Sequence, residues 1–314
     1  MRSLIVILLL SFSASAGVFQ NKEDLVDSVV IIKAVSIVKD GAVLSTTGTG
    51  FYIDNNTVIT SYHVVENSNH IILENESNLV SIGTLIGRDK ISDIAIVRTD
   101  RPGSPVILQP KAVNRRGDDI LIIGHPRNFY FSFSKGIISH TTRKQGNTVT
   151  GIPYIQTDAA INIGNSGSPV FNTDGHVIGM VQAIVTTSGG HEGISLIYPT
   201  KNIIDSIARI NKASDRTARY NYIGVQTECI EATPERPIGN GARVNDVSPS
   251  SPAWRAGIRR NDIIVMLNMT LVDCKNNVYT IVSSAAPGNT MVGVLTRGDR
   301  RESFTVTIEE VSSF

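Results

Sequence analysis

The chain has 314 residues, with 29 Lys or Arg, 28 Asp or Glu and 41% hydrophobic residues. This balance of charge excludes the basic surface of a nucleic-acid-binding protein and an acidic tail. At about 150 residues per domain the length predicts two domains, each large enough to bury its own core. The sequence contains no internal repeat and no low-complexity segment.

The N-terminus has the three parts of a secretory signal peptide. Met1-Arg2 is a short basic start, residues 4–10 are wholly apolar, and Ala14-Ser15-Ala16 is a small-residue cleavage pattern. The alternative is an uncleaved anchor, but the apolar run is far shorter than the roughly 20 residues that cross a bilayer, and no later stretch is long enough. No cysteine follows the run, which argues against a bacterial lipid anchor. We expect cleavage near Ala16/Gly17 and an exported, periplasmic product without a membrane span.

Short β-branched runs separated by Gly, Asn and Asp predict a β-rich first domain, either a sandwich or a barrel. The runs cover residues 29–32, 50–53, 56–60, 70–73, 94–97, 120–123 and 177–181. A further hydrophobic strand is expected from Val170.

The segment Gly-Asn-Ser-Gly-Ser-Pro at 164–169 places Ser166 in a glycine-flanked turn before that last strand. A serine hydroxyl is a weak nucleophile at neutral pH. It needs a base, an acid that orients the base, and N–H groups that face the oxyanion. Small residues allow the N–H groups of Gly164 and Ser166 to converge on one point, with Asn165 shaping the turn. Alone, the segment is equally compatible with an ordinary turn.

A base and an acid for this serine are found earlier in the chain. His63 lies in the segment 58–65, where an apolar strand ends, and Asp93 directly precedes the apolar run 94–97. A carboxylate at the mouth of a buried strand can accept the imidazole N–H, which leaves the other ring nitrogen free to take the serine proton. Asp89 competes for this role, and Asp93 is preferred because the adjoining apolar run shields it from water. The order His, Asp, Ser is that of the chymotrypsin arrangement.

Four ordered motifs resemble the HtrA (Deg) family of serine proteases. They are T-G-T-G-F at 47–51, I-T-S-Y-H-V-V at 59–65, S-D-I-A-I-V at 92–97 and Q-T-D-A-A-I-N-I-G-N-S-G-S-P at 156–169. The resemblance implies two six-stranded chymotrypsin-like barrels with the site between them, and catalytic roles for His63, Asp93 and Ser166. It also implies assembly from trimers. The short segment between Val35 and Thr47 lacks the long regulatory loop of some relatives, which favours the smaller trimeric type.

Two positions near the serine depart from the family pattern. Ile163 stands where Pro is usual, and Ser168 stands where Gly is usual. Both lie in the loop that shapes the oxyanion hole and could shift its resting conformation. Catalytic competence is therefore left open, although the three triad positions are filled.

The resemblance also locates a specificity pocket. In trypsin-like enzymes the pocket floor lies about six residues before the nucleophile, which here is Ala160. An uncharged floor predicts cleavage after Val, Ala, Ile or Thr rather than after Arg or Lys. The walls are expected from apolar strands that carry Val181, Ala183 and Leu196. Asp158 is the rival specificity acid, and we expect it to bond locally instead.

A helix is predicted over residues 201–210, because Ile203, Ile207 and Ile210 share a face and Thr200 can cap the start. Residues 211–219 are polar, lack apolar periodicity and are interpreted as a linker. The expected organisation is a signal peptide at 1–16, a protease domain at 17–210, a linker at 211–219 and a C-terminal domain at 220–314.

From Tyr220 onward the chain resembles a small α+β PDZ domain of the HtrA kind. Tyr222, Ile223, Gly224 and Val225 take the place of the family's carboxylate-binding loop, whose N–H groups face the end of a peptide that adds as an extra strand. The run A-G-I-R-R-N-D-I-I at 256–264 is similar to the family's PDZ core. Asn261 stands there where Gly is usual, and Asn tolerates a left-handed turn.

The two cysteines, Cys229 and Cys274, both lie in the C-terminal domain. In an oxidising compartment they can form a disulfide, and two buried free thiols are the alternative, because the sequence gives no Cα separation. The histidines outside the triad show no metal-ligand spacing, so neither a metal nor another cofactor is expected. These histidines are His70, His125, His140, His176 and His191.

The expected function is that of an exported, ATP-independent serine endoprotease that cleaves unfolded or misfolded envelope proteins. The PDZ domain would bind C-terminal peptides and regulate the protease. A hypothesis of another class remains beside it, in which a weakly catalytic or non-catalytic PDZ sensor or holdase uses the protease fold as a scaffold.

Overall fold

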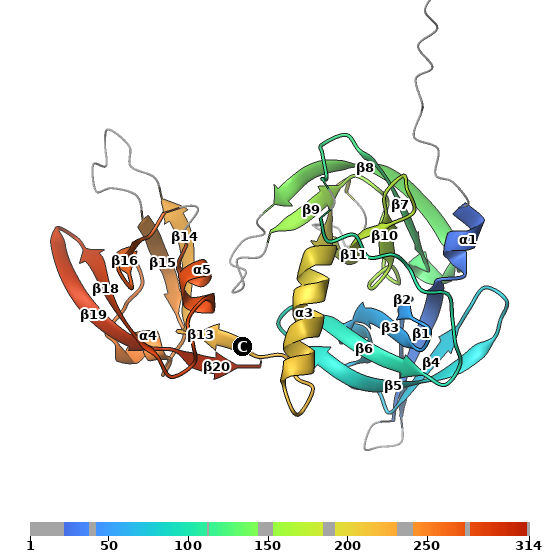
Figure 1. Ribbon diagram of the computed structural model, residues 1–314, viewed down its shortest axis with the longest axis horizontal. Helices are drawn as coiled ribbons and strands as arrows, with labels where there is room; N and C mark the ends of the chain where they lie inside the picture. The colour runs from blue at the N-terminus through green and yellow to red at the C-terminus, as the bar shows by residue number, and fades with distance from the viewer. Residues whose placement is uncertain are drawn as a thin grey trace, which may run out of the picture.

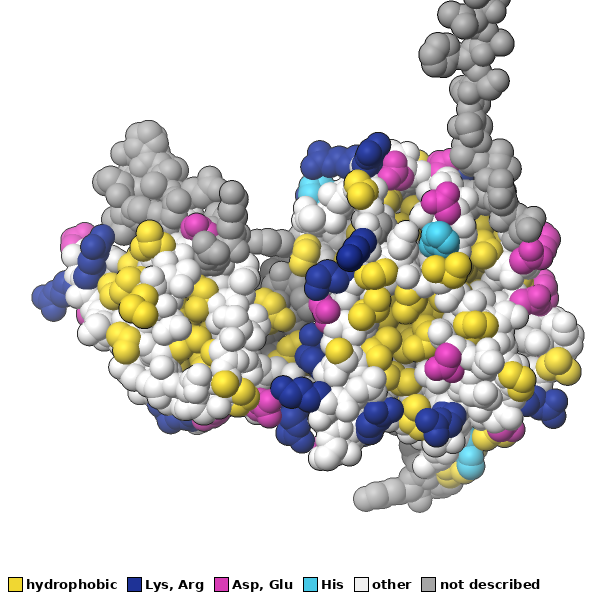
Figure 2. All heavy atoms as spheres, viewed as in Figure 1, with side chains coloured by type: hydrophobic (Ala, Val, Ile, Leu, Met, Phe, Trp, Pro, Cys, Tyr) yellow, Lys and Arg dark blue, Asp and Glu magenta, His cyan; other side chains and the backbone are white. Residues whose placement is uncertain are grey.

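The structure is a computed structural model that describes residues 22–37, 42–111, 113–143, 153–184, 192–230, 241–273 and 277–312. The expected signal peptide lies outside the described residues. Two barrels lie together in Figure 1, and a smaller C-terminal domain is joined to them by the segment after helix α3. Figure 2 shows the same parts from the same side with all heavy atoms drawn. Within the described residues, no helix is both long and apolar enough to cross a membrane.

The first barrel is closed in the strand order β1-β2-β3-β6-β5-β4. Its strands are β1 (Val29–Ile37), β2 (Val43–Asp54), β3 (Thr57–Ser61), β4 (His70–Glu74), β5 (Val80–Asp89) and β6 (Ile94–Thr99). Helix α1 (Lys22–Val26) precedes it, and the short helix α2 (Tyr62–Val65) follows β3. Its interior is filled by residues such as Ile32, Val58 and Val97, because alternate β-branched side chains point inward along each strand.

The second barrel is closed in the order β10-β11-β12-β9-β8-β7. Its strands are β7 (Asp119–Gly124), β8 (Ser132–Arg143), β9 (Tyr154–Thr157), β10 (Pro169–Phe171), β11 (Val177–Ile184) and β12 (Ser195–Pro199), with a 3-10 turn η1 (Pro126–Asn128) after β7. A shared hydrophobic cluster that includes Phe51, Phe171 and Tyr198 joins the two barrels. The expected pair of six-stranded barrels is therefore confirmed.

Helix α3 (Thr200–Lys212) follows the second barrel and continues two residues beyond the expected end. Ile203 and Ile210 are buried against the inter-barrel cluster, as the helical spacing predicts. The expectation that Thr200 caps the helix is wrong, because Pro199 occupies the N-cap position. The Thr200 hydroxyl instead donates a hydrogen bond to the Val177 carbonyl at 2.8 Å, which ties the helix to β11.

The segment between α3 and the C-terminal domain lies along strand β5. The Arg88 N–H donates to the Arg216 carbonyl at 3.0 Å, and the Ala218 N–H donates to the Arg88 carbonyl at 2.9 Å. Ala218 is buried in the inter-barrel cluster. The residues expected to form a linker are thus bonded to the first barrel by main-chain hydrogen bonds.

The C-terminal domain is a small α+β domain, as expected. Its main sheet has the strand order β14-β15-β16-β18-β19, so that β14 is an edge strand, and β17 pairs with β16. These strands are β14 (Val225–Ile230), β15 (Gly241–Val247), β16 (Ile263–Leu267), β17 (Thr270–Leu271), β18 (Thr290–Arg297) and β19 (Arg300–Thr307). Strands β13 (Tyr220–Tyr222) and β20 (Glu309–Val311) pair separately, and the helices are α4 (Pro252–Arg255) and α5 (Val278–Ser283).

Candidate active site

Asp93 holds His63 at two points. The His63 ring nitrogen Nδ1 lies 2.7 Å from Asp93 Oδ2, and the His63 main-chain N–H donates to Asp93 Oδ1 at 2.8 Å. An ionised carboxylate only accepts hydrogen bonds, so Nδ1 carries the proton and Nε2 is left as the acceptor nitrogen. This is the tautomer that a general base for a serine hydroxyl requires.

Asp93 adopts a left-handed backbone conformation, with φ of 54°, in the turn between β5 and β6. Such a conformation in a residue other than Gly costs on the order of 1 kcal/mol and persists where the surroundings fix it. The Asp93 carbonyl also accepts a hydrogen bond from the Tyr62 N–H at 3.1 Å. Main chain and side chain of Asp93 therefore both fix the start of the helix that carries His63.

The Asp93 carboxylate raises the pKa of His63 above its ordinary value, mainly through the hydrogen bond to the ring. The negative charges of Asp93 and Glu66 act in the same direction, and partial burial of the ring opposes them. The ring is nevertheless half-exposed, so it is accessible from solvent. The arrangement stabilises the imidazolium that a general base becomes when it accepts a proton.

Asp89 does not pair with His63. Its side chain is fully buried, and its carboxylate accepts hydrogen bonds from the Tyr220 hydroxyl at 2.6 Å and from the Ser92 N–H at 3.0 Å. Asp93 therefore faces His63, whereas Asp89 faces the interior.

The loop that carries Ser166 is docked on strand β2 of the first barrel. The Thr49 N–H donates to the Ser166 carbonyl at 2.9 Å, and the Thr49 hydroxyl donates to the Gly164 carbonyl at 2.8 Å. A Cβ added to Gly167, whose φ is 88°, would lie 2.1 Å from the Thr49 carbonyl oxygen. Only glycine therefore permits this close approach.

The same strand lies close to the helix that carries His63. A Cβ on Gly48 would lie 2.7 Å from Val64 Cγ2 and 3.2 Å from the Ser166 carbonyl oxygen. The small residues of the T-G-T-G-F motif thus allow the serine loop and helix α2 to pack against one strand.

Two N–H groups of the serine loop are available for an oxyanion. Among the described residues, neither the Gly164 N–H nor the Ser166 N–H has an acceptor, whereas the Asn165 and Gly167 N–H groups donate to Asn162 and Val181. The Ile163 carbonyl accepts from the Arg127 N–H at 2.8 Å. In a trans peptide the N–H points opposite to the carbonyl, so the Gly164 N–H is directed away from Arg127.

The Ser166 hydroxyl itself makes no hydrogen bond to His63 or to any other residue that the structure describes. Among the described residues, the structure therefore brings His63 and Asp93 into contact and leaves the Ser166 hydroxyl without a hydrogen bond. Catalytic hydrogen bonds are often long before substrate binds, so this geometry is compatible with a nucleophile that pairs later.

Asn165 and Ser168 are both buried beneath the turn. The Ser168 hydroxyl donates to Asn165 Oδ1 at 3.4 Å, and a Cβ on Gly124 would lie 2.2 Å from Ser168 Oγ. The larger residue at 168 is accommodated because position 124 has no side chain. The other departure, Ile163, is 73% exposed and needs no space in the interior.

His125 is a neighbour of the loop that the sequence does not single out. It is fully buried, its Nδ1 accepts from the Phe131 N–H at 3.0 Å, and burial lowers its pKa to about 4. A Cβ on Gly164, whose φ is 100°, would lie 2.2 Å from the His125 carbonyl oxygen. A neutral histidine thus supports the segment on which Gly164 rests.

The residues expected at the specificity pocket are placed as follows. Ala160 is exposed, and Leu196 is buried on the face of β12 opposite to Ile197. Val181 packs with the hydrophobic cluster of the second barrel, and the Ala183 side chain lies outside the described residues. Asp158 Oδ1 accepts a hydrogen bond from the Ile137 N–H at 2.7 Å, which is the local bond expected for it.

In the C-terminal domain, the loop from Tyr222 to Val225 leads into the edge strand β14. Gly224 has a φ of 85°, and a Cβ there would lie 2.2 Å from Ser251 Cβ. The N–H groups of Ile223 and Gly224 donate to no residue that the structure describes. The loop thus has the free donors and the open strand edge that peptide addition requires.

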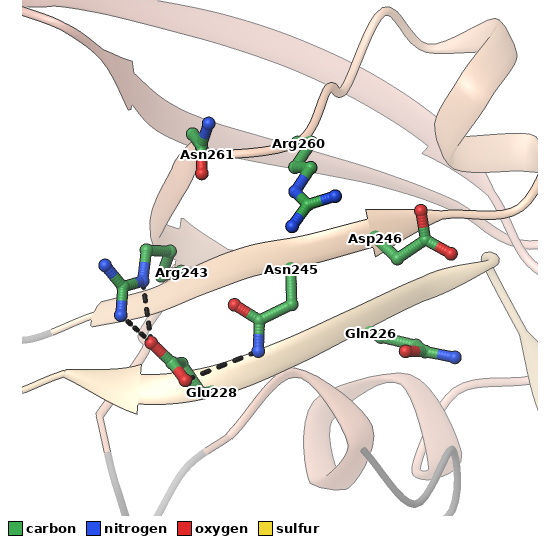
Figure 3. A pocket seen from close by; sticks show the side chains of 7 residues that line it. All are labelled: Gln226, Glu228, Arg243, Asn245, Asp246, Arg260 and Asn261. Atoms are coloured by element: carbon green, nitrogen blue, oxygen red, sulfur yellow. Dashed lines mark hydrogen bonds and ion pairs between the residues drawn. The ribbon is translucent and has the colours of Figure 1, made fainter. Parts of the chain in front are cut away.

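A polar hollow of about 630 Å³ lies on strands β14 and β15 of the same domain (Figure 3). Glu228 in this hollow pairs with Arg243 and with Asn245. The remaining lining residues are Gln226, Asp246, Arg260 and Asn261. Because Glu228 is paired with Arg243 and none of His63, Asp93 and Ser166 lines this hollow, we assign it no catalytic role.

Cys229 is disulfide-bonded in the structure. Its expected partner, Cys274, lies outside the described residues, so the pairing of the two stays a prediction. In the part of the chain that the structure describes, no group of three or more His, Cys, Asp or Glu could hold a metal ion.

Family models match both parts of the chain. The trypsin-like peptidase domain matches residues 48–180, and the PDZ domain matches residues 221–308. The putative serine protease HhoA of Synechocystis sp. is 34% identical over 282 residues, which cover 82% of this chain and 69% of that protein. A probable periplasmic serine endoprotease DegP-like of Chlamydia muridarum is 32% identical, over 84% of this chain and 54% of its own length. The chain spans about half the length of the DegP-like relatives that it matches.

Solved structures show the same likeness. The HtrA-type protease AlgW with tripeptide superposes with a TM-score of 0.76 at 26% identity, over 92% of this chain and 97% of that chain. The serine endoprotease from Yersinia pestis superposes with a TM-score of 0.68 at 27% identity, over 92% and 97% of the two chains. Together with the two barrels and the small C-terminal domain, these relatives show that the chain belongs to the HtrA (DegP-like) family of trypsin-like serine proteases with a PDZ domain.

Proposed function

We propose that this chain is an exported, ATP-independent serine endoprotease in which Ser166 is the nucleophile, His63 the general base and Asp93 the residue that orients the base. The observation that carries the proposal is the two-point hold of Asp93 on His63, at 2.7 and 2.8 Å. It fixes the ring in the tautomer that can accept a proton at Nε2.

In the proposed mechanism the Ser166 oxygen attacks the scissile carbonyl while His63 Nε2 takes the hydroxyl proton. The oxyanion that forms accepts hydrogen bonds from the Gly164 and Ser166 N–H groups. His63 then gives the proton to the departing amine, and an acyl-enzyme remains on Ser166. A water molecule, deprotonated by the same ring, hydrolyses the acyl-enzyme and restores the serine.

The proposed substrates are unfolded or misfolded proteins of the cell envelope, cut after Val, Ala, Ile or Thr. The uncharged residue at position 160 and the local bond of Asp158 to the Ile137 N–H support this preference. The proposed pocket residues remain Ala160, Val181, Ala183 and Leu196. The periplasm is proposed because the DegP-like relatives are named periplasmic.

The PDZ domain is proposed to bind the C-termini of peptides and to regulate the protease domain, within an assembly that we propose to be a homotrimer. The free N–H groups of Ile223 and Gly224 and the open edge of β14 support peptide binding. The HtrA-type protease AlgW, to which this chain is similar, has been solved with a tripeptide and with a decapeptide.

The experiment that tests this function is digestion of an unfolded protein by the mature chain, with the cut sites mapped by mass spectrometry. The matched control is Ser166→Ala, which should lower turnover by on the order of a millionfold while it leaves the melting temperature unchanged. Equal cleavage by the wild type and Ser166→Ala would remove Ser166 from the mechanism. A map of cuts after Arg and Lys would show that an acid reaches the pocket.

The unpaired Ser166 hydroxyl favours a second candidate function, a PDZ sensor or holdase with little turnover. This function predicts that the mature chain suppresses aggregation of an unfolded protein without cutting it, and that saturating apolar C-terminal peptide does not start cleavage. Cleavage that begins on addition of peptide would instead show a protease whose site assembles on demand.

A further inference from the structure

Four buried polar residues form a cluster directly behind the catalytic aspartate. Asp89 is fully buried, Tyr198 and Ser92 are 1% and 2% exposed, and Tyr220 is 6% exposed. We call these residues the Asp89 cluster. The proposed catalytic mechanism uses none of them, yet Ser92 is covalently adjacent to Asp93.

The hydroxyl groups of this cluster form one directed chain of hydrogen bonds. The Tyr198 hydroxyl donates to Ser92 Oγ at 2.7 Å, and the Tyr220 hydroxyl donates to Asp89 Oδ2 at 2.6 Å. Ser92 Oγ and the Tyr220 oxygen lie 2.5 Å apart. Because the Tyr220 proton is used on the carboxylate, the Ser92 hydroxyl must donate to the Tyr220 oxygen. Every proton in the chain is thereby directed toward Asp89.

Ser92 is also fixed through its main chain. Its N–H donates to Asp89 Oδ1 at 3.0 Å, and its carbonyl accepts from the Gln182 side chain at 2.6 Å. Ser92 is therefore held at its N–H, at its hydroxyl and at the carbonyl of the peptide group that leads into Asp93. A shift of Ser92 would be transmitted directly to the left-handed turn at Asp93.

Three parts of the molecule meet in the cluster. Asp89 and Ser92 belong to the first barrel, Tyr198 belongs to β12 of the second barrel, and Tyr220 begins β13, the first strand of the C-terminal domain. The Arg209 guanidinium of α3 lies 4.5 Å from the centre of the Tyr220 ring and 3.5 Å from Asp89 Oδ2. Tyr220 is thus bonded inside the protease domain although its strand pairs with β20 of the other domain.

The neighbouring residue extends this connection to helix α5. The Asn221 side-chain amide donates to the carbonyls of Val282 and Ala285 at 3.2 and 2.7 Å. The end of α5 is therefore hydrogen-bonded to Asn221, and the adjacent residue, Tyr220, carries the hydroxyl that contacts Ser92 and Asp89.

We propose that Tyr220 is a positioning residue for the Asp93–His63 pair, and that through it the C-terminal domain influences the geometry of that pair. Only the predicted effect on turnover rests on the proposed protease function. The positioning itself is a property of the resting chain. Removal of the Tyr220 hydroxyl would leave Ser92 without its acceptor and Asp89 without one donor, so that Ser92 and the Asp93 carboxylate become free to shift.

The test is an NMR titration of the His63 ring in the full mature chain, with His63→Ala used to assign the signal. It compares the wild type with Tyr220→Phe, which retains the ring, and with Tyr52→Phe. Tyr52 is a buried tyrosine in the core of the first barrel and is the matched control for the loss of a hydroxyl. The charged groups that face His63 are Asp93 and Glu66, and only Asp93 is coupled to the cluster.

We expect the His63 titration midpoint to be lower in Tyr220→Phe and unchanged in Tyr52→Phe. A carboxylate misplaced by a fraction of an ångström should also lower kcat by about tenfold or more, with little change in KM. If Tyr220→Phe does not fold, Ser92→Ala breaks the same chain and should give the same shift. Equal midpoints in the wild type and in whichever of these variants is folded would overturn the proposal.

The outcomes for function and for positioning are separable. A shifted midpoint in a chain that hydrolyses nothing would retain the role of Tyr220 and reject the protease function. An unchanged midpoint in a chain that does cleave its substrate would reject the role of Tyr220 and retain the protease function.

Discussion

The main-chain N–H of Thr49 donates a hydrogen bond to the carbonyl of Ser166, so that a strand of the first barrel fixes the Ser166 loop of the second. The Thr49 hydroxyl adds a bond to the Gly164 carbonyl, and its own carbonyl accepts from the Thr60 hydroxyl at 2.7 Å. The geometry of the proposed oxyanion site therefore depends on a residue that lies more than a hundred positions earlier in the chain.

Thr49→Val should lower kcat by roughly tenfold to a hundredfold, because it removes the bond that orients the peptide group after Gly164 while it retains a β-branched shape. The free energy of unfolding should fall by about 1–2 kcal/mol, as expected for a buried hydrogen bond that loses one partner. Steady-state kinetics and urea unfolding measure the two effects. Thr46→Val, on the exposed part of the same strand, is the control and should change neither.

The pH dependence of catalysis should report the Asp93–His63 contact. His63 acts as a base only when it is neutral, and Asp93 raises its pKa. The acid limb of kcat/KM should therefore have its midpoint above the ordinary histidine value of about 6.5, with activity rising as pH rises through it. Asp93→Asn should lower turnover by on the order of ten-thousandfold and move the midpoint down. An acid limb with the same midpoint in the wild type and in Asp93→Asn would show that Asp93 does not set the pKa of His63.

His125 should make the fold sensitive to acid. Its pKa is lowered to about 4 by burial, so the unfolded chain binds a proton at higher pH than the folded chain does. Its contribution to stability is present above pH of about 6.5 and is lost as pH falls toward 4. The loss should be on the order of 2–4 kcal/mol. Urea unfolding of the wild type and His125→Asn between these pH values measures it, and equal slopes of stability against pH would contradict it.

The peptide loop of the C-terminal domain should distinguish a free carboxylate from an amide. We expect the full chain to bind an apolar peptide with a free C-terminus and to bind its C-amidated form much more weakly. The reason is that the N–H groups of Ile223 and Gly224 can donate to a terminal carboxylate, whereas the amide carries no negative charge. Gly224→Val should abolish the difference, since a side chain there collides with Ser251. Fluorescence titration with both peptides is the measurement. Equal affinity for the two forms would leave the loop as a structural element.

The sequence predicts local features of this molecule better than distant contacts. The continuous runs rich in β-branched residues, such as those beginning at Val29 and Ile94, are strands of the observed barrels. Strand β5 was not predicted because Gly83 and Gly87 interrupt its pattern. A Cβ on Gly83 would lie 2.7 Å from both Leu73 Cδ1 and Val97 Cγ1, so these glycines serve close packing rather than turns.

In the candidate site, too, the sequence predicts the local motifs and not the contacts between distant residues. The motif around His63 and the motif around Asp93 are each complete in a few residues, so their chemistry is visible in the sequence. The bond between Ser92 and Tyr220 joins positions 128 residues apart, and Tyr220 lies next to a segment whose polarity predicts only a linker. His125 likewise has no local signal, because its role comes from burial against the Gly164 segment.

The most direct test of the central claim is covalent labelling of the mature chain with a fluorophosphonate probe, which reacts only with a serine that is activated and faces an oxyanion site. The account predicts labelling of Ser166 in the wild type, a severe loss of labelling in His63→Ala, and none in Ser166→Ala. Labelling should increase with pH through the His63 midpoint. A wild-type chain that stays unlabelled in the presence of an apolar C-terminal peptide, while circular dichroism shows it folded, would contradict the claim.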